Sequence, residues 1–330
     1  MLSLTPALRD VLTVAAHSPS GHNTQPWKVK VLAADALLIR SDPQRWLTAV
    51  DPANRELLLS FGAFAETLAQ AAAAAGWHAD LAVVATAPTD TDIWRVAFSP
   101  AAERSAASAA GGTILTQRVT TRTPFATRAL EAQHVQALLG IAPTVSYVPR
   151  ESVEGRWLVD GMAAAFRQQT LDDQKQAELA TWLRFSRSAV KRRGDGLTAE
   201  ALGISFPVRL AWYTVFRLST ALSSAFRNSS INNTRAQAQG CAGFVLIRSR
   251  DASIAALLET GRVYERVCLK MTELGVAHHT MSQALEEAPW AQEIQGALQS
   301  ADPIQFVIRV GYARKLARPS IRRSIDDFIE

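Results

Sequence analysis

The chain has 330 residues, of which 48% are hydrophobic and 20% are charged, and its net charge is +5. This composition excludes a disordered chain, and a content of 2 cysteines excludes a disulfide-stapled secreted module. The length allows a large apolar core and suggests about two domain-sized units.

The hydrophobic pattern predicts the elements in chain order. They are helices over 5–16, 53–75, 130–139, 153–184 and 253–274, strands around 29–31 and over 36–40, 81–86, 93–98, 244–248 and 304–310, and a connector over 101–112. Asp51 and Pro52 are favourable residues at the start of the second helix, and Gly76 is favourable at its end.

The two cysteines, Cys241 and Cys268, belong to no CxxC pair and are expected to be buried, reduced thiols. The first residues lack the pattern of a secretory signal, so the expected compartment is the cytoplasm. We expect no membrane-spanning helix, because the most apolar stretch, 206–226, is interrupted by Arg209 and Arg217.

One short pattern occurs twice. LLSFG at 58–62 is followed 14 residues later by Gly76, and LLETG at 257–261 is followed 14 residues later by Gly275. Both copies lie in long predicted helices that end in glycine and precede a strand-rich segment. We therefore predict an internally duplicated α+β fold, with one half over 1–110 and the other over 111–330.

The positive charge is concentrated in the second half. Residues 1–110 carry −2 and the remainder carries +7, with basic clusters at 184–193 and 309–323. Such clusters suit nucleic acid, a phosphate-bearing small molecule or a solvated basic face. Since no nucleic-acid-binding signature accompanies them, a phosphate-bearing small molecule is the favoured interpretation, and the solvated face stays open.

Several other chemistries lack support. The 6 histidines form no HExxH or Cys-His pattern, so no metal site is predicted, and no GxSxG sequence indicates a hydrolase. Residues 194–199 match GxGxxA, but they follow the basic residues 191–193 instead of an apolar strand. We interpret them as a flexible polar loop.

Residues 18–27, SPSGHNTQPW, lie between a predicted helix and a predicted strand. Their hydroxyl and amide groups suit a polar heterocycle with a hydroxylated tail, held by a loop on a rigid support. On composition alone, the same side chains could instead bond to the backbone of a proline-bounded turn.

SPSGHNTQPW resembles the SPSxxNxQPW loop of FMN-dependent nitroreductases, which in that family approaches the flavin of the partner subunit in a homodimer. The resemblance implies that cofactor-binding residues of this loop are Ser20, Gly21, His22, Asn23, Thr24 and Gln25.

Residues 117–125, QRVTTRTPF, resemble the RRSxRxF segment of the same family, from which Val119 departs. In that family, two cations and a hydroxyl hold the flavin phosphate and the ring edge. The resemblance implies these roles for Arg118, Thr120 and Arg122.

The ending, 318–328, is similar to the family's closing RRPxxDxx segment, whose cations contact the phosphate. Arg322 and Arg323 take these positions, and a forked guanidinium suits bidentate contact with phosphate. Met281 and Ser282 follow the second glycine-ended helix and are expected to line the flavin ring.

Each half carries a different part of these expected cofactor-binding residues. The chain resembles, over nearly its whole length, the Acg-like branch of the superfamily, in which the motifs are divided in the same way. The resemblance implies one flavin site in a fused pseudo-dimer, with a nitroreductase-like fold of two helix-flanked antiparallel sheets. Helices 53–75 and 253–274 would form the interface between the halves. The aromatic-rich segment 184–240 would be a lid over the flavin, with a buried core helix or an amphipathic surface helix as alternatives.

The function implied by the resemblance is that of an FMN-dependent enzyme, which takes a hydride from NAD(P)H and reduces nitroaromatic or quinone-like acceptors. No catalytic acid or base is named, because the cofactor performs the redox step. The alternative is FMN storage or sequestration beneath a closed lid, with little turnover. The expected partners are small molecules, neither nucleic acid nor a membrane, and the chain is expected to be a monomer.

Overall fold

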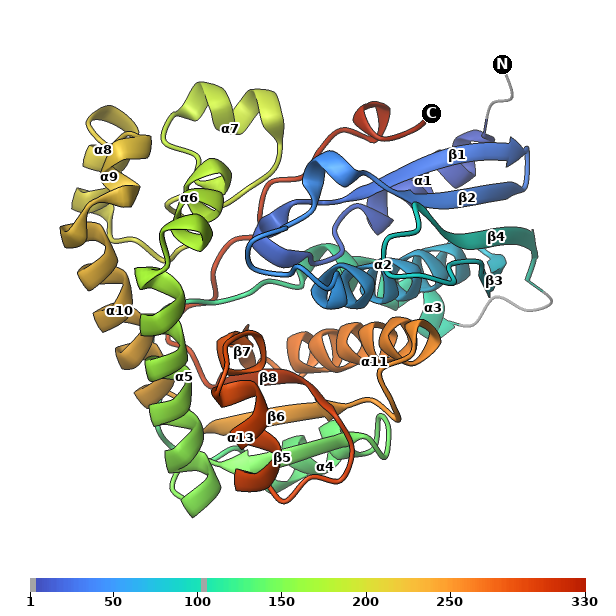
Figure 1. Ribbon diagram of the computed structural model, residues 1–330. Coiled ribbons are helices and arrows are strands. Elements are labelled where there is room, and N and C mark those ends of the chain that lie inside the picture. The colour runs from blue at the N-terminus through green and yellow to red at the C-terminus, as the bar shows by residue number, and fades with distance from the viewer. Residues whose placement is uncertain (1–3, 102–105) are drawn as a thin grey trace.

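The computed structural model describes residues 4–101 and 106–330, which form two sheets with helices between and around them (Figure 1). The strands are β1 (Trp27–Ala33), β2 (Ala36–Ser41), β3 (Trp77–Val83), β4 (Asp92–Pro100), β5 (Val145–Pro149), β6 (Gly243–Arg248), β7 (Ala277–Thr280) and β8 (Ile304–Gly311). The helices are α1 (Pro6–Ala15), α2 (Arg55–Ala74), α3 (Ala106–Gln117), α4 (Ala132–Leu139), α5 (Val153–Leu171), α6 (Asp173–Trp182), α7 (Arg187–Arg193), α8 (Phe206–Thr214), α9 (Leu218–Leu222), α10 (Ser224–Gln239), α11 (Ile254–Glu273), α12 (Gln283–Glu286) and α13 (Trp290–Ala297). Three short 3₁₀ helices are η1 (Gly21–Asn23), η2 (Pro43–Arg45) and η3 (Ile325–Asp327).

The two sheets have the same construction. Their strand orders are β1-β2-β4-β3 and β5-β6-β8-β7, and every neighbouring pair is antiparallel. In each, a long helix follows the second strand in sequence, α2 in one and α11 in the other. The predicted α+β class with two antiparallel sheets is therefore confirmed.

The helices α2 and α11 cross between the two sheets (Figure 1). At the crossing, the backbones meet at Gly62 and Gly261. A Cβ on Gly62 would lie 2.8 Å from the Gly261 Cα, and a Cβ on Gly261 would lie 2.9 Å from the Gly62 Cα. The repeated LLxxG pattern thus marks the closest approach of the two helices, which confirms that they pair.

Some element boundaries differ from the sequence-based prediction. The helix α2 begins at Arg55, because Asp51 remains outside it and its Oδ2 accepts a hydrogen bond from the Leu57 N–H at 2.9 Å. The helix predicted over 153–184 is two helices, because Asp172 is extended and caps α6. Of the predicted connector 101–112, residues 102–105 lie outside the described part, and the rest from Ala106 belongs to α3.

Burial explains two further features. Among the described residues, α2 is the one helix long and apolar enough to cross a membrane, and 72% of its apolar window is buried inside the protein. It thus has the character of a core helix. On the sequence pattern alone, another segment, 206–226, is expected to be the most apolar stretch. Both cysteines are buried and unpaired, as predicted.

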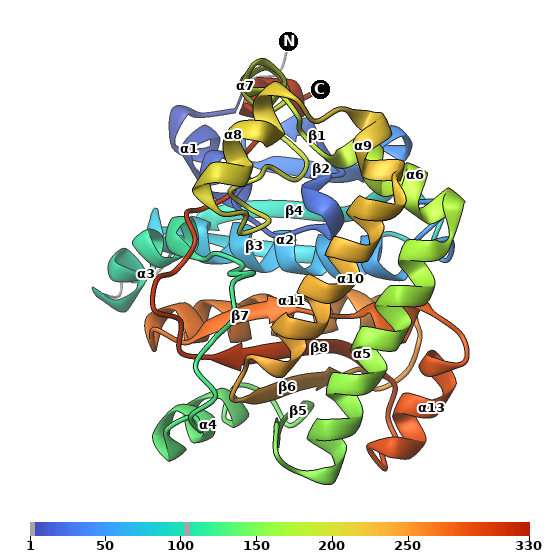
Figure 2. The ribbon, with the colours of Figure 1, turned by 90° about the vertical axis from the view of Figure 1, so that its left-hand side faces the viewer.

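Residues 184–240 form a helical insertion around a small core that they share with the end of α6. Trp212 is at its centre, with its ring 4.8 Å from that of Phe185, and its indole N–H donates to the Arg184 carbonyl at 2.8 Å. On the same helix α8, Phe206 and Leu210 are 74% and 66% exposed. The insertion returns to the second sheet through α10, which packs along α5 (Figure 2).

The C-terminal tail crosses from the second sheet to the first. After β8, the chain reaches the outer edge of β1, where the Val29 N–H donates to the Phe328 carbonyl at 2.7 Å. The Glu330 N–H then donates to the Val29 carbonyl at 2.8 Å. The tail therefore covers an otherwise open strand edge of the other sheet.

Candidate functional site

The loop 18–27 has an unusual backbone. His22, Asn23 and Gln25 all have positive φ, at 47°, 55° and 49°. Such conformations cost non-glycine residues roughly 1–3 kcal/mol each and persist only where surrounding bonds hold them. One of these bonds is local, from the Gln25 N–H to the Ser20 Oγ at 2.9 Å.

The amide side chains of this loop hold the helical insertion and the tail. Gln25 is fully buried, its Nε2 donates to the Gly194 carbonyl at 2.9 Å, and its Oε1 accepts from the Arg323 N–H at 2.9 Å. Asn23 donates to the carbonyls of Gly196 and Ile321, both at 3.1 Å. Three segments that are distant in sequence therefore meet at this loop.

The same contacts overturn the flexible-loop prediction for residues 194–199. Asp195 is 3% exposed, and its carboxylate is shared by Arg184 at 2.6 Å and Arg45 at 2.8 Å. The Gly196 N–H donates to the Asn23 carbonyl at 3.0 Å. Partners far away in the sequence thus make this segment a buried junction.

The two tail arginines point to different places. Arg322 donates to the Asn23 Oδ1 at 3.1 Å and to the His17 carbonyl at 2.7 Å. Arg323 donates to the carbonyls of Gln25 at 2.9 Å and Trp27 at 3.3 Å, and to that of Asp327. Arg322 thus lies with His17 at the end of α1, whereas Arg323 lines a separate pocket.

Arg118 joins Arg322 at the end of α1. It is 5% exposed and donates to the same His17 carbonyl at 3.3 Å. Burial and the charge of Arg118 lower the pKa of Arg322 to about 9. Among the described residues, the one carboxylate that pairs with these arginines is that of Glu265, 3.4 Å from the Arg118 Nε, and burial raises its pKa to about 7. A buried cation, Arg118, and a half-buried one, Arg322, therefore share one partly compensating acid.

Several buried polar atoms of these arginines, of the loop 18–27 and of residues in or just after β7 have no hydrogen-bond partner among the described residues. They include Nε and Nη1 of Arg118, Nε of Arg322, Oγ of Ser18 and Ser282, Nδ1 of His22 and Nε2 of His278. Buried polar atoms are normally paired, so a concentration of orphans calls for a ligand or water. We refer to Arg118, Arg322, His17 and Glu265 as the dication cluster.

The remaining predicted site residues lie on several elements. Thr120 bridges to His278 in β7, and Thr24 is buried in the loop beside Gly21. Arg122 donates to the Ala201 carbonyl in the insertion at 2.7 Å, and burial lowers its pKa to about 10. Met281 is fully buried.

Sequence reasoning missed Glu265, although the repeat contains a signal for it. Glu66 and Glu265 both lie four residues after the motif glycine, and both are buried. Glu66 pairs with Arg262 at 3.0 Å, and Glu265 pairs with Arg118. His17 contributes through its backbone carbonyl, for which a sequence has no signal. Within the described ranges, no group of three or more metal-ligating side chains occurs.

Comparisons with known proteins agree with the motifs. No family model matches the chain. A Mycobacterium tuberculosis protein with the provisional name NAD(P)H nitroreductase acg is 26% identical, over 98% of this chain and 95% of its own length. The M. tuberculosis protein Rv3127 is 25% identical over 98% of this chain and 92% of its own. The FMN-dependent nitroreductase NfnB of Mycobacterium smegmatis, solved with NADPH, has a TM-score of 0.41 at 14% identity, covering 67% of this chain and 92% of that one.

The resemblance predicted from the motifs is confirmed by the near full-length similarity to acg. The chain is thus similar over nearly its whole length to proteins that carry the Acg name.

Proposed function

We propose that the chain is an FMN-binding oxidoreductase of the nitroreductase type, which takes a hydride from NAD(P)H and passes electrons to a nitroaromatic or quinone-like acceptor. The observation that supports it most is the dication cluster. A phosphate dianion beside Arg118 and Arg322 would compensate the excess charge and pair with their unpartnered nitrogen atoms.

The energetic reason is the cost of buried charge. An ion moved into the protein interior loses several kcal/mol of hydration unless it is paired and hydrogen-bonded. Glu265 meets Arg118 through one oxygen at 3.4 Å, and its second oxygen has no hydrogen-bond partner. The residues present therefore fit the phosphate end of FMN.

The remaining orphan atoms fit the polar parts of the same cofactor. The flavin supplies hydride transfer when bound, and the chain supplies its position and surroundings. The hydroxyls of Ser18 and Ser282 and the ring nitrogen of His278 are donors or acceptors of the kind that a ribityl chain and a flavin edge require. Arg122 donates to the Ala201 carbonyl of the insertion.

In this proposal the chain is a pseudo-dimer with one site, made of a half over 1–110 and a half over 111–330. The first half contributes the loop 18–27 and the His17 carbonyl, and the second contributes Arg118, Arg122 and the tail. The insertion 184–240, attached through Gly194, Gly196 and Ala201, covers the site as a lid. We propose that the protein acts as a monomer in the cytoplasm.

The test begins with the visible spectrum of the purified protein, followed by anaerobic addition of NADH or NADPH. A yellow protein that a nicotinamide bleaches, and that an acceptor then reoxidises, supports the enzyme. A yellow protein that no nicotinamide bleaches supports storage of FMN in place of turnover. A colourless protein that cannot be reconstituted with FMN refutes both.

The role of the cluster is tested with Arg322→Ala. Because charge-assisted hydrogen bonds contribute about 1.5–3 kcal/mol, we expect the FMN dissociation constant to rise about 10- to 100-fold. Arg322→Lys should recover part of the loss, and Arg250→Ala, at a cation whose side chain is 84% exposed, should change nothing. Unchanged FMN affinity in Arg322→Ala would contradict the assignment.

A further inference from the structure

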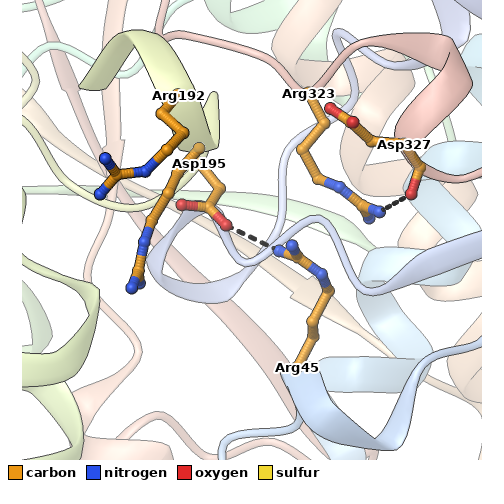
Figure 3. Close-up of a pocket in the computed structure, with 6 residues that line it drawn as sticks. Arg45, Arg192, Asp195, Arg323 and Asp327 are labelled. Atoms are coloured by element: carbon orange, nitrogen blue, oxygen red, sulfur yellow. Dashed lines mark hydrogen bonds and ion pairs between the residues drawn. The ribbon is translucent and has the colours of Figure 1, made fainter. Parts of the chain in front are cut away.

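A second cationic site lies on the other side of the loop 18–27. It is a cavity of about 370 Å³ where η2, the end of α7 and the tail at η3 meet (Figure 3). Its lining is formed by Arg45, Arg192, Arg193, Asp195, Arg323 and Asp327.

The two carboxylates of the lining are already engaged. Asp195 is held by Arg45 and Arg184, as described above. Asp327 accepts from the Ser324 N–H at 3.1 Å through its carboxylate, and Arg323 contacts its backbone oxygen instead. Asp195 therefore pairs with one lining cation, Arg45, and among the described residues neither acid forms an ion pair with Arg192, Arg193 or Arg323.

The cations have unused capacity. Arg323 is 6% exposed, its hydrogen bonds go to backbone carbonyls, and its buried Nε has no hydrogen-bond partner. Burial and the charge of Arg45 lower the pKa of Arg323 to about 10. Arg192 and Arg193 are exposed, and over residues 4–101 and 106–330 neither forms an ion pair.

We infer that this cavity binds a phosphate dianion, either free or as the terminal phosphomonoester of a small molecule. Arg323 and Arg45 form its inner wall, and Arg192 and Arg193 reach it from the insertion. Forked guanidinium groups from several directions suit the oxygen atoms of phosphate.

Binding there has a structural consequence. Arg192 and Arg193 end α7, at the base of the insertion, whereas Arg323 belongs to the tail and Arg45 to the first half. A shared anion would therefore connect the insertion to the body of the protein. The site is separate from the dication cluster, because Arg322 and Arg323 extend to different sides of the loop.

The test is calorimetric titration of the FMN-loaded protein with inorganic phosphate and, separately, with glucose 6-phosphate. We expect saturable binding that weakens at least tenfold in the double variant Arg192→Ala/Arg193→Ala, because two charge-assisted contacts are removed. Lys191→Ala, which removes a neighbouring cation outside the lining, should bind as the unmodified protein does. Tighter binding of glucose 6-phosphate identifies a phosphomonoester, and equal or weaker binding identifies free phosphate.

Two results would overturn the inference. One is the absence of saturable binding of either probe to the unmodified protein. The other is equal affinity in the double variant and the unmodified protein. Titration of Arg322→Ala separates the two proposals, since phosphate binding should persist there even where FMN affinity falls. Loss of phosphate binding in Arg322→Ala would place the phosphate in the dication cluster and refute the second site.

Discussion

Replacing Gly62 with alanine would put a methyl group into the closest approach of α2 and α11. The new Cβ would lie 2.8 Å from the Gly261 Cα and closer still to the Leu258 carbonyl oxygen. Ordinary contact begins at 3.4 Å and the Leu258 oxygen would lie at 2.0 Å, so the two helices must move apart by about 1.4 Å at this point. Both neighbours are backbone atoms, which have no rotamer through which to avoid the methyl group.

The expected cost follows from this separation. A gap of only about 0.5–1 Å already forfeits a quarter to a half of the dispersion energy between the facing atoms, and overpacking of a core costs about 1–3 kcal/mol. Alanine regains about 1 kcal/mol through its helix propensity. Because the clash involves two backbones in the centre of the molecule, we expect Gly62→Ala to lower the free energy of unfolding by about 2 kcal/mol.

The assay is urea unfolding followed by circular dichroism. Gly296→Ala is the matched control, because Gly296 also lies in a helix and a Cβ there would have no atom within 4 Å, so it should be neutral or stabilising. Adding Gly261→Ala to Gly62→Ala should cost less than it does alone, since the helices are then already apart. A stability of Gly62→Ala equal to that of Gly296→Ala would refute the reasoning.

Three further predictions concern buried groups. Burial, followed by the charge of Arg118, lowers the pKa of His278 to about 3 from 6.5, so the folded state resists protonation, and stability falls as the pH drops below 6.5. Between pH 7 and pH 5 this loss of stability is about 2 kcal/mol. His278→Gln should abolish the loss when the apoprotein is unfolded with urea at each pH, and an unchanged pH dependence in the variant would contradict the prediction. Gln25→Ala leaves two buried backbone groups unpaired, and should cost roughly 2–4 kcal/mol and speed amide hydrogen exchange at 194–197; unaltered exchange would show that other bonds hold this segment. On α8, Trp212→Ala should cost about 3–5 kcal/mol in thermal unfolding and Leu210→Ser less than about 0.5, a difference that would vanish if the insertion were not packed as described.

Much of the fold was predictable where the hydrophobic period is long and its ends are marked. Ser253 and Gly275 mark the two ends of the helix predicted over 253–274. In the structure, Ser253 caps the start of α11, and Gly275 has a positive φ directly after its end. The strands β5 and β7 were missed for a physical reason. β5 ends in a proline and β7 contains two histidines, so neither shows strand-like alternation, and pairing with β6 and β8 makes them strands.

For the site, the sequence resemblance located Arg118 and Arg322, which the structure brings together. It could not separate Arg322 from Arg323, because successive side chains of an extended segment point to opposite sides. The mistaken interpretation of residues 194–199 has a similar cause. The local sequence is rich in glycine and charge, and the partners that bury Asp195 are Arg45 and Arg184.

Two parts of the first half, α2 and the edge of β1, are covered by residues that come late in the sequence, and this has a consequence for synthesis on the ribosome. The apolar helix α2 is complete long before α11, which begins at Ile254, and the edge of β1 is covered only by the last residues, Phe328 to Glu330. A nascent chain therefore exposes an apolar helix and an unpaired strand edge during most of translation, both of which promote aggregation. This protein should accordingly depend on chaperones that bind nascent chains more than a protein whose first half is covered by its own residues.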